Sequence, residues 1–362
     1  MKRLLCSIAL LLCAATLLAQ DPYPNVEFID AKNLTLVGKL MLDTPNPYHR
    51  VDTVRYKGFT DVENAQVRSA SGLALAFKTD SPTLHIRAKY GYKNYDTKTM
   101  GLALRGFDLY IRKDGEWLWA SSACPRLNDE DSPFLLLGGM DGSVKECLVY
   151  LPLYSELNSL EIGIAKGAYI EASPNPFRYR IGVFGSSYTH GISAGRAGMA
   201  YPAQLSRLTG LQFLSLGCSG NCKMQDYFAD VLCDAEVDAF LFDSFSNPDP
   251  ETIAERLFPF IEKIQKAHPG IPLIFQQTIY RERRNFNHEV DQNEQVKQDK
   301  AEEMMAEACK RYKDVYFIHP NATSSDHETS VDGTHPSDEG YRIWAESIKK
   351  PLRKILRKYG IR

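Results

Sequence analysis

One serine in this chain lies in a setting that suits nucleophilic chemistry. Ser187 belongs to the segment 185–191, GSSYTHG, which directly follows the apolar run 181–184. A tight, glycine-flanked turn after a buried strand can point a hydroxyl outward, as a nucleophile requires. Turns rich in glycine and serine are common in α/β proteins, so this segment alone is equally consistent with a structural turn.

A base and an orienting acid for such a serine occur together near the C-terminus. Asp332 and His335 are three residues apart in the segment DGTHP, just before the last predicted helix. A serine nucleophile needs a base within hydrogen-bond reach, and that base needs an acceptor that fixes its tautomer. Taken singly, Asp332 is as consistent with a turn or helix cap, and His335 with a surface histidine.

The surrounding elements predict that these residues meet. Short apolar runs alternate with helical stretches. The apolar runs are 181–184, 213–216, 240–242, 273–275 and 315–318, and the predicted helices are 201–208, 250–267, 293–313 and 337–356. This alternation indicates a parallel sheet between two layers of helices. Loops after parallel strands converge on one edge of the sheet, so Ser187 and His335 are expected at the same edge.

The chain before residue 175 has a different pattern. Apolar and polar residues alternate at 84–90, 107–111 and 160–164, and Lys113-Asp114-Gly115 separates two such segments as a hairpin turn would. Many short strands of this kind predict a β-sandwich or jelly roll. Two prolines at 172–177 indicate a linker, so the predicted organisation is a β domain at 20–174 and an α/β domain at 175–362.

The first residues predict export. A basic pair at 2–3 precedes an apolar run, and Ala19 provides a small residue for cleavage. These are the parts of a secretory signal peptide, predicted at 1–19, and the run is short for a bilayer span of about 20 residues. A buried N-terminal helix is one alternative. Lipid attachment at Cys13 is another, opposed by Leu12 where a small residue is expected. The mature chain is predicted to be secreted or periplasmic, without an integral membrane span.

Charge and cysteine content narrow the possible partners. The chain has 43 Lys and Arg against 45 Asp and Glu, and loss of the basic pair leaves 41 against 45, which changes the net charge from −2 to −4. This balance offers no basic field to nucleic acid. Export permits disulfides or free structural thiols among the cysteines that remain, Cys124, Cys147, Cys218, Cys222, Cys233 and Cys309.

Four blocks resemble the motifs of the SGNH/GDSL hydrolase family, in the same order. GSSYTHG at 185–191 resembles GDSxTxG, LGCSGN at 216–221 resembles LGxSGN, FLFDSFSN at 240–247 stands where a strand leads into GxND, and DGTHP at 332–336 matches DxxHP. GFDLY at 106–110 reproduces the GxDLY motif of a branch of secreted bacterial esterases with an N-terminal β domain, which GMAYP at 198–202 also resembles. The resemblance implies a flavodoxin-like, three-layer α/β/α catalytic domain behind a β-sandwich.

The resemblance also implies roles for individual residues. Ser187 would be the nucleophile, His335 the general base and then acid, and Asp332 its orienting partner. The backbone N–H groups of Ser187 and Gly220, with the side-chain amide of Asn247, would form the oxyanion hole. Such preorganised donors are worth about 3–4 kcal/mol each as charge develops on the carbonyl oxygen. No metal ion and no organic cofactor is expected.

The chain departs from the family motifs at a few positions. Ser186 stands where the family has Asp, and because that Asp is not a triad member we expect altered loop packing rather than loss of activity. Phe245 replaces a frequent Gly, and Pro248 a frequent Asp. Gly217 competes with Gly220 for the role of the glycine in the second block.

Other groupings have competing interpretations. His319, Asp326 and His327, together with the Asp332/His335 pair, suggest a metal site but lack a helical H-x3-H spacing with carboxylate support. The charged run 281–284 predicts a solvated loop. His190 is expected either to pack the nucleophile loop at 185–191 or to contact substrate. Aromatic residues that could stack on sugar rings or simply serve the core and hairpins are Tyr90, Tyr92, Tyr95, Trp117 and Trp119.

The sequence therefore predicts a secreted serine esterase that removes small O-acyl groups, with acetyl expected, from an acylated carbohydrate. The carbohydrate part depends only on the family resemblance, export and the added β domain. One alternative is a lipase or thioesterase for longer acyl chains, although no long hydrophobic insertion provides a groove or lid. The other is a carbohydrate-binding protein whose hydrolase half has lost activity.

Overall fold

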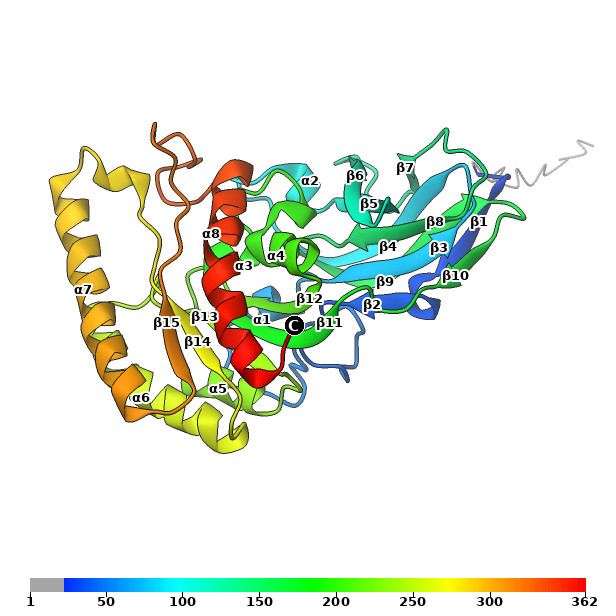
Figure 1. Ribbon diagram of the computed structural model, residues 1–362. Coiled ribbons are helices and arrows are strands. Elements are labelled where there is room, and N and C mark those ends of the chain that lie inside the picture. The colour runs from blue at the N-terminus through cyan, green and yellow to red at the C-terminus, as the bar shows by residue number, and fades with distance from the viewer. Residues whose placement is uncertain (1–22) are drawn as a thin grey trace, which may run out of the picture.

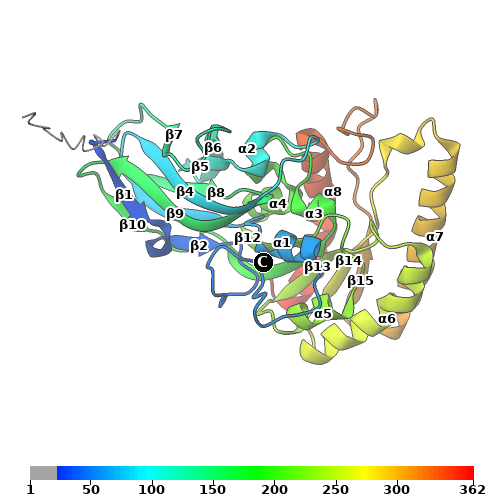
Figure 2. The same cartoon turned by 180° about the vertical axis from the view of Figure 1, so that it is seen from behind.

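The computed structural model describes residues 23–362, so the predicted signal peptide at 1–19 lies outside the described residues. A β domain, which holds β1 to β10, lies beside an α/β domain, which holds β11 to α8 (Figure 1). Figure 2 shows the same arrangement from behind. Among the described residues, no helix combines the length and apolar character needed to cross a membrane.

The β domain is a sandwich of two antiparallel sheets, as predicted. One sheet has the order β1-β9-β4-β7, with β1 Val26–Asp30, β9 Ser155–Ala165, β4 Leu84–Lys93 and β7 Phe134–Leu137. The other has the order β10-β3-β8-β5-β6, with β10 Ile170–Ala172, β3 Ala74–Thr79, β8 Lys145–Tyr150, β5 Phe107–Lys113 and β6 Glu116–Ala123, and β2 Thr35–Val37 pairs with β3. A core that includes Leu84, Ile86 and Phe107 fills the space between the sheets.

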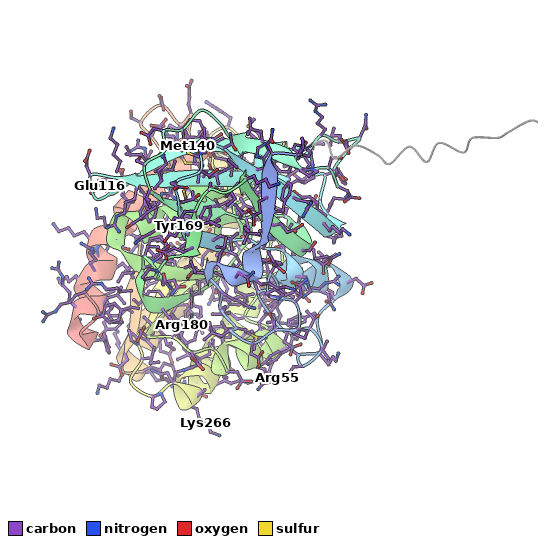
Figure 3. All side chains as sticks on the ribbon, turned by 90° about the vertical axis from the view of Figure 1, so that its right-hand side faces the viewer. Arg55, Glu116, Met140, Tyr169, Arg180 and Lys266 are labelled. Carbon is purple, nitrogen blue, oxygen red and sulfur yellow. The ribbon has the colours of Figure 1, made fainter. Side chains whose placement is uncertain are left out.

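The predicted hairpin forms between β5 and β6. Lys113 pairs with Glu116, and the two turn residues, Asp114 and Gly115, have φ of 52° and 86°. A two-residue turn with both φ angles positive matches the right-handed twist of the flanking strands, which explains the Asp-Gly pair. Figure 3 shows the β domain end-on, with Glu116 labelled at the start of β6.

The α/β domain contains one parallel sheet with the order β12-β11-β13-β14-β15, which is the flavodoxin-like order that was predicted. The strands are β11 Arg178–Gly185, β12 Leu211–Gly217, β13 Ala239–Asp243, β14 Leu273–Gln276 and β15 Val315–Ile318. Each contains one of the predicted apolar runs. The runs are continuous because both faces of the sheet are covered.

Helices cover the two faces of this sheet in separate layers (Figures 1 and 2). Val183 of β11 points into a core with α4 (Tyr201–Thr209) and α8 (Asp338–Leu356). Its neighbour Phe184 points to the other side, toward α5 (Asp226–Cys233), α6 (Pro250–Ala267) and α7 (His288–Arg311). The helix α5 was not predicted, and neither were the short helices α1 (Asp61–Arg68), α2 (Gly101–Leu104) and α3 (Ser187–His190).

The two domains share an extensive interface. Part of the N-terminal half, including Leu40, Val51 and Val67 of α1, packs into the α/β core beside β12 and α5. The division after residue 174 therefore separates the two sheet systems but not the two cores, and we keep it as a proposal for the domain boundary. All six cysteines among residues 23–362 are free thiols.

The GxDLY motif lies at this interface. The buried carboxylate of Asp108 accepts hydrogen bonds from Trp119 Nε1 (3.0 Å) in its own domain and from Arg196 Nη1 (2.8 Å) and Gly198 N (2.8 Å) across the interface. Tyr110 of the same motif also accepts from Arg196 (2.6 Å). The motif thus joins the β domain to the GMAYP segment of the α/β domain, which explains structurally why both segments occur in the same chain.

Candidate active site

The turn after β11 presents Ser187 as the first residue of α3. Ser186 caps this helix by accepting a hydrogen bond from Tyr188 N. A Cβ atom at Gly185 would lie 1.9 Å from Thr189 Oγ1, so only glycine allows the strand to turn this tightly into the helix. Ser187 is 7% exposed, which leaves its hydroxyl in a largely dry environment.

The structure brings together the three residues predicted as a triad. Ser187 Oγ lies 3.0 Å from His335 Nε2, and His335 Nδ1 lies 2.9 Å from Asp332 Oδ2. The other oxygen of Asp332 accepts from the backbone N–H groups of Thr334 (3.0 Å) and His335 (2.8 Å). The carboxylate is therefore held within its own loop, and it fixes His335 with Nδ1 protonated and Nε2 free to accept a proton.

The electrostatic setting keeps the imidazole uncharged at neutral pH. Burial lowers the pKa of His335, Asp332 opposes this, and the cations Lys98 and Arg281 add to the lowering. Burial would raise the pKa of Asp332, but the hydrogen bonds and charge of His335 outweigh it and hold that pKa below its ordinary value. At neutral pH the pair is thus a carboxylate next to a neutral histidine, which is the state a general base requires.

A residue of the β domain also reaches this pair. Lys98 Nζ lies 3.1 Å from Asp332 Oδ2, the same oxygen that accepts from His335. Lys98 follows β4 in the sequence, and nothing in its local sequence indicated this contact. The β domain therefore contributes a charge to the site as well as packing against it.

The two glycines considered for the oxyanion hole have different environments. A Cβ at Gly217 would lie 2.1 Å from His190 N, so this glycine allows β12 to pack closely against α3. Gly220 has φ of 73°, and a Cβ there would meet no atom within 4 Å, so its backbone is left-handed and open. Gly217 has a packing role, and Gly220 remains the candidate donor.

One hydrogen bond to its side-chain oxygen holds the amide of Asn247. Its Oδ1 accepts a hydrogen bond from Cys222 N (3.2 Å), which holds the amide plane and directs Nδ2 away from that contact. The residue is half-buried at the loop after β13, at the same sheet edge as Ser187. Neither Phe245, which is buried, nor Pro248 disturbs this arrangement.

A buried carboxylate that was not predicted supports the nucleophile turn. Asp243, the last residue of β13, accepts hydrogen bonds from Ser186 N (3.1 Å), Ser186 Oγ (2.7 Å), Thr189 Oγ1 (3.1 Å) and Ser246 Oγ (3.0 Å). Burial raises the pKa of Asp243, and these hydrogen bonds oppose the rise. The chain therefore has Ser186 where the family motif has Asp, and places a carboxylate against that turn from the neighbouring strand. This pairing explains the departure at Ser186.

The charged run 281–284 was predicted to be solvated, and this is wrong for two of its arginines. Arg281 donates to Tyr188 Oη (2.9 Å) and to Ser246 O (2.7 Å), and pairs with Glu294 (2.6 Å). Arg284 is buried and bonded to side chains of α7. Arg281 thus ties the residue after the nucleophile to the residue before Asn247.

His190 packs the site rather than facing open solvent. It is fully buried, stacks on Tyr154 with 3.9 Å between ring centroids, and donates from Nε2 to Leu153 O (2.8 Å). Burial lowers its pKa well below the usual value, and the Arg50 charge adds to this. Tyr154 donates to Ser219 Oγ (2.7 Å), which in turn donates to His190 Nδ1 (3.3 Å), so the network holds the residue next to Gly220.

The residues considered for a metal site do not gather into one cluster. His319 pairs with Glu302, and His327 pairs with Glu282. Asp326 accepts a hydrogen bond from Glu328 N (3.3 Å) in its own loop. Within residues 23–362, no three His, Cys, Asp or Glu side chains gather in a way that could hold a metal ion.

Two family descriptions match the sequence. Residues 178–353 match the GDSL-like Lipase/Acylhydrolase family, and residues 26–170 match the N-terminus of Esterase_SGNH_hydro-type, named GxDLY. No curated protein matches the chain.

Solved structures resemble the chain over nearly its whole length. A protein from Bacteroides ovatus ATCC 8483, described as a GDSL-like lipase, is 38% identical with a TM-score of 0.88, covering 92% of this chain and 98% of that one. A salicylyl-acyltransferase from a tetracycline biosynthetic pathway is 21% identical (TM-score 0.67; 94% and 99% covered). A family two carbohydrate esterase from Cellvibrio japonicus is 12% identical (TM-score 0.60; 92% and 98% covered) and shows the shared fold.

The matched ranges contain the Ser187, His335 and Asp332 cluster in one and the GxDLY motif in the other. The chain therefore belongs to the GDSL-like lipase/acylhydrolase family, with the N-terminal domain of SGNH-type esterases.

Proposed function

We propose that this protein is a serine esterase in which Ser187 is the nucleophile, His335 the general base and acid, and Asp332 the residue that orients His335. The observation that carries the proposal is the continuous hydrogen-bonded line Ser187 Oγ–His335 Nε2 (3.0 Å) and His335 Nδ1–Asp332 Oδ2 (2.9 Å). A serine hydroxyl is a weak nucleophile by itself, and a neutral imidazole at this distance activates it.

The reaction follows from these positions. Ser187 Oγ attacks the ester carbonyl carbon while its proton passes to His335 Nε2. The developing oxyanion accepts hydrogen bonds from the N–H groups of Ser187 and Gly220 and from Asn247 Nδ2. His335 then protonates the leaving alcohol, which departs and leaves an acyl group on Ser187. A water molecule gives its proton to His335 and attacks the acyl group. His335 then returns this proton to Ser187 Oγ as the C–O bond to the serine breaks, which releases the acid and restores the free serine.

We propose that the substrate is a carbohydrate that carries small O-acyl groups, with acetyl as the expected group. Three points support this: the shared fold of a carbohydrate esterase, a β domain that reaches the site through Lys98, and a net charge of −4 for the mature chain, which suits a neutral polymer. We also propose that the protein is exported through the signal peptide at 1–19. Cell fractionation with N-terminal sequencing tests this, because mature protein is expected to begin after Ala19.

Kinetics of the mature protein test the enzymatic proposal. Wild type and Ser187→Ala are compared on 4-nitrophenyl acetate, butyrate and octanoate, and loss of the nucleophile is expected to lower kcat by at least about 10⁴-fold. Equal turnover by the two proteins would contradict the mechanism, and activity abolished by a chelator would favour a metal-dependent one. Preference for octanoate over acetate would instead support a lipase or thioesterase.

A further inference from the structure

A cavity of about 270 Å³ is formed by the β-domain half of the chain and by His190 of α3, the helix that begins with Ser187. Its walls come from α1, from β4 and the segment that follows it, from Tyr154 just before β9, and from His190 of α3. The residues on which the argument depends are Asp61, Gln66, Tyr92, Asn94, Tyr154 and His190. Both domains are therefore needed to form it.

One wall of this cavity borders the loop that contains Gly220. Gln66 donates to Ser219 O (2.8 Å) and accepts from Asn221 Nδ2 (3.0 Å), so it contacts the residues on both sides of Gly220. Tyr154 bonds to Ser219 Oγ, and His190 lies one helical turn after Ser187 in α3. A group bound in the cavity would thus lie next to the candidate oxyanion hole.

The opposite wall is held in place by the β domain. Tyr92 N donates to Glu156 Oε2 (2.9 Å), which anchors the end of β4. Further along the same segment, Lys98 contacts Asp332, and Thr99 Oγ1 accepts from Ser193 N (2.9 Å). The segment 92–99 therefore runs from the cavity to the Asp332/His335 pair.

The lining has the chemistry that a sugar ring requires. Tyr92 is 46% exposed, which leaves much of its side chain open to a ligand at the cavity. The C–H groups on one side of a pyranose suit the electron-rich face of an aromatic ring. Asp61 and Asn94 provide an acceptor and an amide for hydroxyl groups at the ring edge.

The size of the cavity also suits a sugar ring. Sites for drug-sized ligands occupy about 300–1,000 Å³, so a cavity of about 270 Å³ suits one ring rather than a long chain. An acetyl group alone would leave most of it empty. We propose that this cavity is the subsite for the pyranose ring whose acyl group is removed, with Tyr92 as its stacking platform and Asp61 and Asn94 as its hydroxyl contacts. This inference rests on the proposed serine esterase function.

A comparison of two substrates tests the subsite. A monoacetylated methyl β-xylopyranoside contains the ring, whereas 4-nitrophenyl acetate contains only the acyl group and an aryl leaving group. Tyr92→Ala and Asn94→Ala are expected to lower the ratio of kcat/KM for the xyloside over 4-nitrophenyl acetate, by about tenfold for Tyr92→Ala. Tyr169→Ala is the matched control, since Tyr169 is similarly exposed (41%) and lies on the end of the β domain that Figure 3 shows.

The outcomes separate the subsite from the reaction. An unchanged ratio in both variants, or a wild type that hydrolyses the xyloside no faster than ethyl acetate, would overturn the subsite and leave the serine esterase standing. If wild type and Ser187→Ala hydrolyse 4-nitrophenyl acetate equally, the proposed function fails instead. Binding of methyl β-xylopyranoside by ligand-observed NMR then decides about the cavity: a signal that Tyr92→Ala weakens supports it, and no signal contradicts it.

Discussion

Replacement of Lys98 by methionine tests whether the β domain tunes the catalytic base. The substitution removes the ammonium group and keeps an unbranched side chain. Lys98 Nζ lies 3.1 Å from Asp332 Oδ2, and this oxygen lies 2.9 Å from His335 Nδ1, so the cation is at most about 6.0 Å from the ring nitrogen, the sum of the two. Around the imidazole, the other groups are Asp332, Arg281 and the Tyr188 ring.

The expected shift follows from this distance. Two unit charges 6 Å apart interact by about 0.7 kcal/mol at the dielectric constant of water, which corresponds to about half a pKa unit. The water value is appropriate because the Lys98 side chain is 51% exposed. A cation disfavours a protonated neighbour, so its removal raises the pKa of His335. The base must be neutral to act, and the acidic limb of the activity profile therefore moves to higher pH by about half a unit.

The pH dependence of kcat/KM on 4-nitrophenyl acetate between pH 4.5 and 8.5 measures this shift at low ionic strength. The shift is expected to shrink in 0.5 M NaCl, because salt screens exposed charges. Lys89→Met is the control, since Lys89 is an exposed lysine of β4, the strand that precedes Lys98. An acidic limb that stays in place or moves to lower pH in Lys98→Met would refute the argument.

Four further substitutions, the last two compared as a pair, test the supports of the site. Asp243→Asn leaves some of the four donors to this side chain without an acceptor, so we expect the free energy of unfolding to fall by about 1–3 kcal/mol and kcat to fall as well. Urea unfolding measures the first effect and ester kinetics the second, and unchanged stability would contradict this expectation. Asp108→Asn removes the charge that pairs with the Arg196 guanidinium and is expected to cost about 3 kcal/mol, measured in the same way, whereas a neutral effect would deny the GxDLY motif its role between the domains. Gly217→Ala forces the backbone of His190 to move and is expected to cost about 3 kcal/mol, against about 1 kcal/mol for Gly220→Ala; the reverse order would exchange the roles of the two glycines.

The strands of the parallel sheet could be predicted because their signal is local. Each is a short apolar run, since both faces of the sheet are buried, and β15 has the predicted bounds 315–318. The helix α5 has only eight residues and no side-chain cap at Gln225, so its local signal is weak. The helix α1 lies in a half dominated by alternating strand patterns, which obscure the capping box formed by Thr60 and Glu63.

The catalytic candidates have local signals too, but their roles follow from the resemblance to the SGNH/GDSL motifs, because each residue taken alone is as consistent with a structural role. Ser187 lies in a turn motif, and Asp332 and His335 lie three residues apart in one loop. Three other residues reach this site only through the tertiary fold, so no local pattern indicates their contacts. They are Asp243 from the neighbouring strand, Lys98 from the β domain and Arg281 from a distant loop. Asp243 was not predicted, although two signals could have identified it: it is a carboxylate at the end of a buried strand, and the family's Asp is missing at Ser186.

Covalent labelling of Ser187 tests the central claim most directly. The mature protein is treated with a fluorophosphonate, a reagent that phosphonylates activated serine hydroxyls, and the adduct is located by intact-mass and peptide mass spectrometry. We predict one adduct per chain, on the peptide that contains Ser187, none on Ser187→Ala, and much slower labelling of His335→Ala. A wild type that hydrolyses 4-nitrophenyl acetate yet has its adduct on another residue, or none at all, would contradict the account.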